Sequence, residues 1–230
     1  MTQVEAALLR EGLNGAPLGR ILEIGSGSGR LTAVLLARSP QVVASDATLP
    51  LLRRLVLPGL PPFPKVAANV FHLPFPDGSF AAVTMFRVFG FLPDPALALR
   101  EIRRVLRPDG RLVLSVEPHP SWGSLVDDLK VGLARGPDDG PPRMTFSRAP
   151  IVPVRPSAYP SWSPSRARLR ELVEAERFSL VADYPCGLED FVGLRRLPPS
   201  IFLGMARALS RLGGFPTRIL VLQRAPGGSA

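Results

Sequence analysis

Residues 21–29 carry the strongest chemical signal in the chain, because three glycines alternate with other residues directly after an apolar run. The segment reads Ile-Leu-Glu-Ile-Gly-Ser-Gly-Ser-Gly. Glycine lets the backbone turn sharply and lets a ligand approach bare peptide groups. A helix that begins after such a turn adds unpaired N–H donors and the positive end of its dipole. The segment therefore predicts a cradle for a nucleotide or another cofactor.

The glycine spacing narrows the type of cofactor. The dinucleotide fingerprint needs G-x-G-x-x-G and the phosphate-binding loop needs a Lys-Ser/Thr pair, and this segment has neither. It has an acid followed by glycines at every second position, which resembles the first motif of class I S-adenosylmethionine-dependent methyltransferases. The resemblance implies S-adenosylmethionine as the cofactor and S-adenosylhomocysteine as its product. It also implies that the cofactor is bound by Glu23, Gly25, Ser26, Gly27 and Gly29.

An acidic residue at the end of the second apolar run supports the same interpretation. Residues 42–46 read Val-Val-Ala-Ser-Asp, and Ala47 follows. A carboxylate at the end of the second strand can accept hydrogen bonds from both ribose hydroxyls. We expect Asp46 to take this role, with Ala47 as a neighbouring contact. The alternative is that Asp46 caps a helix that begins at residue 47.

Two later segments narrow the family further. Residues 73–80 read Leu-Pro-Phe-Pro-Asp-Gly-Ser-Phe, and residues 92–116 combine a helical apolar pattern, a Pro-Asp-Gly turn and a strand-like run. With the glycine motif, they are similar to the type 11 subfamily of methyltransferases, which includes quinone-biosynthesis enzymes. The resemblance covers about residues 18–118. It implies an enzyme that transfers a methyl group to a small, apolar or aromatic molecule.

Three positions depart from the pattern of that family. Asn69 stands where an acid usually receives the adenine amino group, and its side-chain carbonyl can accept the same hydrogen bond. We expect Val70 and Phe86 to contact the cofactor as well. Ala81 replaces an acid, and the Phe-Gly-Phe-Leu of residues 89–92 replaces a His-His-Leu segment. These departures leave open a second hypothesis, a non-catalytic protein that binds the cofactor.

The order of the apolar segments predicts a doubly wound, Rossmann-like α/β fold. We expect seven strands in a mostly parallel sheet, and the resemblance implies that the last strand is antiparallel. Residues 1–230 are interpreted as one domain. The expected strands lie near residues 20–25, 41–46, 65–69, 79–86, 111–117, 178–184 and 217–223. The expected helices lie near residues 4–12, 29–38, 47–56, 95–107, 164–177 and 200–212.

Two segments lie outside this alternation and are expected to determine substrate selectivity. Residues 118–163 are rich in Pro, Gly and Arg and show no clear periodicity, which is typical of a functional or a disordered segment. Residues 185–216 are inserted between the last two strands. Their expected helix should face the core; the alternatives are that it caps the cleft, touches a membrane surface or joins two subunits of a homodimer.

The catalytic residue cannot be assigned from the pattern. His119 is the weak candidate for a general base, because imidazole titrates near neutral pH and the residue follows the fifth expected strand. The other polar or aromatic candidates near this end of the strand are Glu117, Trp122, Tyr159 and Trp162. No group of histidines, cysteines and acids has metal-ligand spacing, so we expect no metal.

Composition bears on partners and on the compartment. The chain has 28 basic and 19 acidic residues and a formal charge of +9, but its arginines are spread along the chain. An RNA-binding segment would concentrate them among aromatic residues, so a tRNA or rRNA methyltransferase is the alternative hypothesis and a small-molecule acceptor is favoured. With one cysteine, Cys186, no signal segment and no run long enough to span a membrane, we expect a cytoplasmic protein.

Overall fold

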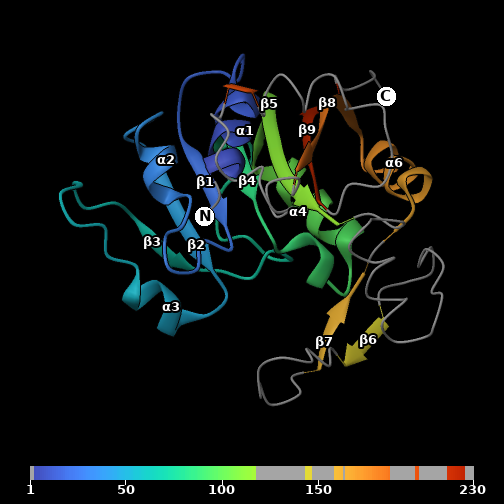
Figure 1. The fold of residues 1–230 in the computed structure, drawn as a ribbon, viewed down its shortest axis with the longest axis horizontal. Helices are drawn as coiled ribbons and strands as arrows, with labels where there is room; N and C mark the ends of the chain where they lie inside the picture. The colour runs from blue at the N-terminus through green and yellow to red at the C-terminus, as the bar shows by residue number, and fades with distance from the viewer. Residues whose placement is uncertain are drawn as a thin grey trace.

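The computed structural model describes residues 3–117, 143–146, 158–162, 164–186, 200–201 and 217–225. Seven strands form one sheet in the order β3-β2-β1-β4-β5-β9-β8 (Figure 1). Their bounds are β1 Ile21–Ile24, β2 Val42–Asp46, β3 Lys65–Ala67, β4 Phe80–Met85, β5 Leu106–Val116, β8 Phe178–Cys186 and β9 Thr217–Arg224. β1 to β5 pair in parallel, whereas β9 pairs antiparallel with both β5 and β8. The predicted fold class is therefore confirmed.

Helices cover both faces of this sheet. They are α1 Gln3–Leu13, α2 Thr32–Leu36, α3 Leu49–Arg54, α4 Pro95–Val105 and α6 Arg166–Ala175, with the 3-10 helix η1 at Phe89–Phe91. Buried residues of α1 and α2 share one apolar cluster with the sheet, and buried residues of α4 and α6 share another. Successive side chains along a strand point to opposite faces, so neighbours such as Ile21 and Leu22 pack in different clusters.

Two predicted helices begin later than expected, for a local reason in each case. The helix predicted over residues 29–38 is α2, which begins at Thr32, because Gly29 has φ +88° and cannot lie in a right-handed helix. The helix predicted over residues 47–56 is α3, which begins at Leu49 after the N-cap Thr48. The helix predicted over residues 200–212 falls mostly outside the described residues.

The fifth strand begins earlier than predicted, before the Pro-Asp-Gly segment and not after it. β5 begins at Leu106, directly after α4, and includes the Pro-Asp-Gly segment of residues 108–110. Leu106 pairs with Phe80 of β4, and pairing then resumes between Arg111 and Ala82. The residues between form a bulge, which accommodates a proline that has no N–H to donate to a neighbouring strand.

A two-stranded antiparallel sheet lies in the segment for which no regular structure is predicted. β6 Arg143–Phe146 pairs with β7 Ala158–Ser161. In Figure 1 this pair lies apart from the seven-stranded sheet. Directly after β7, the backbone N–H of Trp162 donates to the carbonyl oxygen of Gly90 at 2.7 Å, which connects this segment to η1. In the described part of the chain, no helix is long and apolar enough to span a membrane.

Candidate active site

A large open cleft lies at the carboxyl ends of the parallel strands. Its empty volume is about 1300 Å³, including solvent at its mouth, and it is lined by the segments that follow β1, β2, β3 and β4. β1 has β2 on one side and β4 on the other, so the segments after these strands diverge there. Such a switch point is where doubly wound α/β folds bind ligands.

Gly25 allows two of these segments to approach each other. Its φ of +72° lies in the left-handed region, and a Cβ at this position would overlap Cγ2 of Val88, which follows β4. Gly27 also has a positive φ, of +54°, but no atom lies within 4 Å of where its Cβ would be. The glycine loop therefore packs against the segment after β4 at Gly25 and presents bare backbone at Gly27.

Asp46 holds the glycine loop from the end of β2. Its Oδ2 accepts the Gly27 N–H at 2.9 Å, and its Oδ1 accepts the Thr48 N–H at 2.7 Å. The helix-cap alternative is wrong, because α3 begins at Leu49 with Thr48 as its N-cap and Asp46 accepts no N–H from the helix itself. Asp46 lines the cleft with a carboxylate whose orientation is fixed by two backbone donors.

Asn69 and Val70 lie where the segment after β3 enters the cleft. The Oδ1 of the exposed Asn69 accepts the Phe71 N–H at 3.0 Å, and Val70 is buried with 8% of its surface exposed. A carbonyl oxygen has two lone pairs, so Oδ1 can accept a second hydrogen bond from a ligand. Val70 adds an apolar contact next to it.

Glu23 lies beneath the glycine loop in a small polar cavity that adjoins the cleft. Burial raises the pKa of Glu23 to about 7; hydrogen bonding from Thr32 and the charge of Arg30 oppose this rise, and Asp46 adds to it. The Thr32 hydroxyl donates to Glu23 Oε2 at 2.6 Å. The buried hydroxyls of Ser26 and Thr84 line the same cavity and have no hydrogen-bond partner within the described part of the chain.

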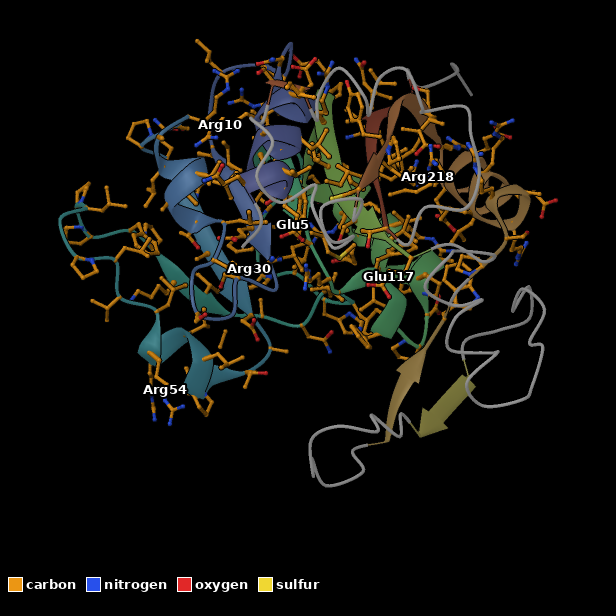
Figure 2. All side chains as sticks on the ribbon, viewed as in Figure 1. Glu5, Arg10, Arg30, Arg54, Glu117 and Arg218 are labelled. Carbon is orange, nitrogen blue, oxygen red and sulfur yellow. The ribbon has the colours of Figure 1, made fainter. Side chains whose placement is uncertain are left out.

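A buried carboxylate of α1 holds two arginines at the cleft. Glu5 Oε2 accepts from Nη1 of Arg30 at 2.5 Å, and Glu5 Oε1 accepts from Nε of Arg87 at 3.0 Å. Burial alone would raise the pKa of Glu5, but the two guanidinium groups outweigh it and hold the pKa below its ordinary value. Figure 2 shows Glu5 and Arg30 close together between α1 and the loop before α2.

A second cavity adjoins the cleft and shares Arg87 and Phe91 with it. Its empty volume is about 370 Å³, and Glu117 and Trp162 also line it. Glu117 follows β5, and Trp162 is buried against Phe89 with their ring centroids 5.9 Å apart. Of the other candidates for this region, His119 and Trp122 lie outside the described residues. Tyr159 lies in β7, opposite Thr145 of β6.

The structure brings most of the predicted cofactor-binding residues to one place. Eight of them line the cleft, namely Gly25, Ser26, Gly27, Asp46, Ala47, Asn69, Val70 and Phe86. Glu23 lines the adjoining polar cavity, whereas Gly29 packs against Leu55 and Leu57. Ala81 is fully buried in β4 and does not line the cleft, so its departure from the family pattern concerns packing.

The sequence analysis missed Glu5, Arg30 and Arg87 as parts of the site. Their ion pairs join residues 25 and 82 positions apart, which no local spacing reveals. The available signal was Glu5 itself, an acid among the apolar residues of the expected first helix. A charged residue on a buried face needs a partner, and its presence predicts one.

Comparison with known proteins identifies the family. The model of a family described as a methyltransferase domain matches residues 22–114. A demethylmenaquinone methyltransferase of Mycolicibacterium vanbaalenii is 35% identical over 177 residues, which cover 74% of this chain and 72% of that protein. This chain belongs to the class I S-adenosylmethionine-dependent methyltransferases. Its type 11 assignment agrees with the resemblance of the sequence motifs.

Two other methyltransferases are also similar to the chain. A demethylmenaquinone methyltransferase of Thermus thermophilus is 40% identical over 111 residues, which cover 46% of this chain and 50% of that protein. The chain therefore spans about half the length of that relative. The structure of a Burkholderia thailandensis 1,6-didemethyltoxoflavin-N1-methyltransferase has a TM-score of 0.58 at 20% identity, covering 96% of this chain and 77% of that one. This similarity supports the shared fold.

The cleft of this methyltransferase fits the cofactor of its family, S-adenosylmethionine. Bare backbone at Gly27 leaves room for a ligand against the loop, and Asp46 provides an oriented acceptor for hydroxyl groups. The unpartnered hydroxyls of Ser26 and Thr84 offer further polar groups beneath the loop. The cleft thus combines acceptors, donors and space at the switch point of the sheet.

We predict that Gly25→Ala destabilises the methyltransferase more than Gly27→Ala does. Both substitutions put alanine at a positive φ, which costs about 1–2 kcal/mol. Only Gly25→Ala adds an overlap with Val88, and overpacking costs about 1–3 kcal/mol more. Urea unfolding of both variants without cofactor measures the difference. Equal losses of stability would mean that the approach of Val88 relaxes without cost.

We predict that Glu23→Gln changes how stability depends on pH. The folded pKa of about 7 lies above the ordinary value of 4.5, so the folded state holds a proton that the unfolded state has lost between these values. The stability that protonated Glu23 gives to the wild-type protein is therefore lost as pH rises from about 5 to 7. Between pH 5 and 8, the unfolding free energy of Glu23→Gln should gain about 2–3 kcal/mol relative to wild type. A difference that is constant with pH would contradict the raised pKa.

Proposed function

We propose that this chain transfers a methyl group from S-adenosylmethionine to a small, apolar or aromatic molecule. The observation that carries the proposal is the convergence of the glycine loop, Asp46 and Asn69 on one cleft. Membership of the methyltransferase family supplies the cofactor, and the names of two relatives, demethylmenaquinone methyltransferases, point to a quinone-like acceptor.

The cofactor-binding roles follow from the positions of the polar groups. Asp46 would accept hydrogen bonds from the ribose hydroxyls, because its carboxylate is oriented by Gly27 and Thr48. Asn69 Oδ1 would accept from the adenine amino group, with Val70 against the ring. The glycine loop, at Gly25, Ser26 and Gly27, would contact the methionine part of the cofactor, with Glu23 in the adjoining cavity. Phe86 and Ala47, which also line the cleft, would add apolar contacts.

The second cavity is the proposed place of the acceptor. Phe91 and Trp162 give it aromatic walls, and Arg87 and Glu117 give it polar groups at its edge. Apolar rings would pack against these walls, and larger acceptors would extend to the solvent. Because Arg87 and Phe91 also line the main cleft, an acceptor here would adjoin the cofactor directly.

The bound cofactor would supply a methyl group already activated on a sulfonium sulfur. The chain would then contribute mainly by holding the acceptor in line with that group and by excluding water. Packing of Trp162 on Phe89, and its hydrogen bond to Gly90, would keep the aromatic wall fixed relative to η1. We therefore expect a rate enhancement that depends more on the shape of the second cavity than on a single proton-transfer group.

Calorimetry and a transfer assay test this function. The purified chain should bind S-adenosylmethionine and S-adenosylhomocysteine with micromolar dissociation constants, and should methylate a naphthoquinol but not bulk tRNA or rRNA. Binding without transfer to any fraction of a cell extract would support the non-catalytic hypothesis. Transfer to RNA, with an affinity that falls steeply as salt rises, would support the RNA hypothesis. Absence of binding would contradict the proposal.

We predict that Asp46→Ala weakens the binding of S-adenosylhomocysteine by about 1.5–3 kcal/mol, the usual contribution of a hydrogen bond to a charged group. Titration calorimetry measures the loss. Asp109→Ala is the matched control, since Asp109 is exposed in β5 and lies outside the cleft. Unchanged affinity in Asp46→Ala would remove Asp46 from the ribose site and leave it only the role of holding the glycine loop.

A further inference from the structure

The cleft holds an excess of positive charge at one end. Within the described part of the chain, the charged side chains that line it are Arg30, Asp46 and Arg87. Arg30 and Arg87 share one counter-charge, the carboxylate of Glu5, whose side chain is 3% exposed. Two guanidinium groups and one carboxylate leave one positive charge there. Because the two guanidinium groups lower the pKa of Glu5, its carboxylate stays ionised at neutral pH. The charges of Glu23 and Glu117 also act on Arg30 and Arg87, so the excess of positive charge is largest while Glu23 is protonated.

The glycine loop itself has few donors left for an anion. The N–H of Gly27 donates to Asp46, the N–H of Ser26 donates to the Ser45 carbonyl, and the N–H of Gly29 donates to the Ser26 carbonyl. The helix that follows, α2, has only five residues and begins two residues beyond Arg30. An anionic group at this end of the cleft must therefore be bound mainly by side chains.

The two arginines are held in place and still have donors to spare. Arg30 uses Nη1 for Glu5, and Arg87 uses Nε and Nη2, whereas each guanidinium has five N–H groups. The backbone of Arg87 has φ +57°, which is unfavourable for a residue with a side chain, and its N–H donates to Ser115 Oγ at 2.7 Å. This fixed turn directs Arg87 toward Glu5, and thus toward Arg30.

We propose that Arg30 and Arg87 form the subsite for the α-carboxylate of the cofactor, and that Glu5 is the positioning residue that orients both guanidinium groups. This inference rests on the proposed function. A carboxylate would complete the charge balance of the Glu5–Arg30–Arg87 cluster, and arginine matches a carboxylate with two parallel hydrogen bonds. Without Glu5, the two like charges would repel each other and their side chains would regain rotational freedom.

Comparison of two ligands tests the subsite. S-adenosylhomocysteine contains the amino acid part, whereas 5′-methylthioadenosine has the same nucleoside and sulfur without it. In calorimetry of the full chain, Arg30→Gln and Arg87→Gln should each weaken S-adenosylhomocysteine binding by about tenfold or more, the range of a lost charge-assisted hydrogen bond. Binding of 5′-methylthioadenosine should change by less than about twofold. Glu5→Gln should lower the ratio of the affinity for S-adenosylhomocysteine to the affinity for 5′-methylthioadenosine by about three- to tenfold.

The matched control is Arg54→Gln, which removes the same charge from an exposed arginine of α3 outside the cleft (Figure 2). It should leave both affinities unchanged. The subsite would be overturned if the three test variants weakened the binding of both ligands equally, or the binding of neither. A merely structural role of Glu5 would leave the ratio of the two affinities unchanged. If the wild-type chain bound neither ligand, the proposed function would itself fail. Retained binding of 5′-methylthioadenosine also reports that a variant is folded.

Discussion

The site depends on the absence of a side chain at Gly25. Val88 occupies the space that a Cβ at residue 25 would need. The segments that follow β1 and β4 can therefore meet only because residue 25 is a glycine. Their approach brings Arg30 and Arg87 within reach of one carboxylate, although Arg30 directly follows the glycine loop and Arg87 comes much later in the sequence. A bulkier residue would separate the two segments, so the packing of the loop and the charge arrangement of the cleft have the same origin.

The cleft is electrostatically divided along its length. Asp46 supplies a carboxylate at the end of β2, and the cluster of Glu5, Arg30 and Arg87 supplies positive charge beside the end of β4. In the proposed binding mode, S-adenosylmethionine would match this division, since its neutral hydroxyls need an acceptor and its carboxylate needs cations. The N-terminal helix thus takes part in the site through Glu5, although its other buried residues pack on the sheet.

The strands and their order could be predicted because their signals are local. Apolar runs such as residues 42–46 identify buried strands, and the glycines and Asp46 lie next to the strand ends in sequence. The bulge in β5 could not be foreseen, because Pro-Asp-Gly usually ends an element and only pairing with β4 decides otherwise. The Glu5 cluster was missed for a similar reason, since its contacts join three elements that are distant in sequence. The roles of the predicted site residues stay predictions that calorimetry can test.

Two buried glutamates near Arg30 have opposite pKa shifts, and the geometry explains why. Glu5 contacts guanidinium groups with both oxygens, whereas Glu23 receives only a hydroxyl from Thr32 and is further disfavoured as an anion by Asp46. Glu5 therefore stays ionised at neutral pH, and Glu23, with a pKa of about 7, is protonated in part. The cluster with Arg30 and Arg87 carries one positive charge while Glu23 is neutral, and this charge is cancelled when Glu23 ionises. The sheet thus places a titrating group in the polar cavity that adjoins the cleft, and the net charge of this group together with the Glu5 cluster falls as Glu23 ionises.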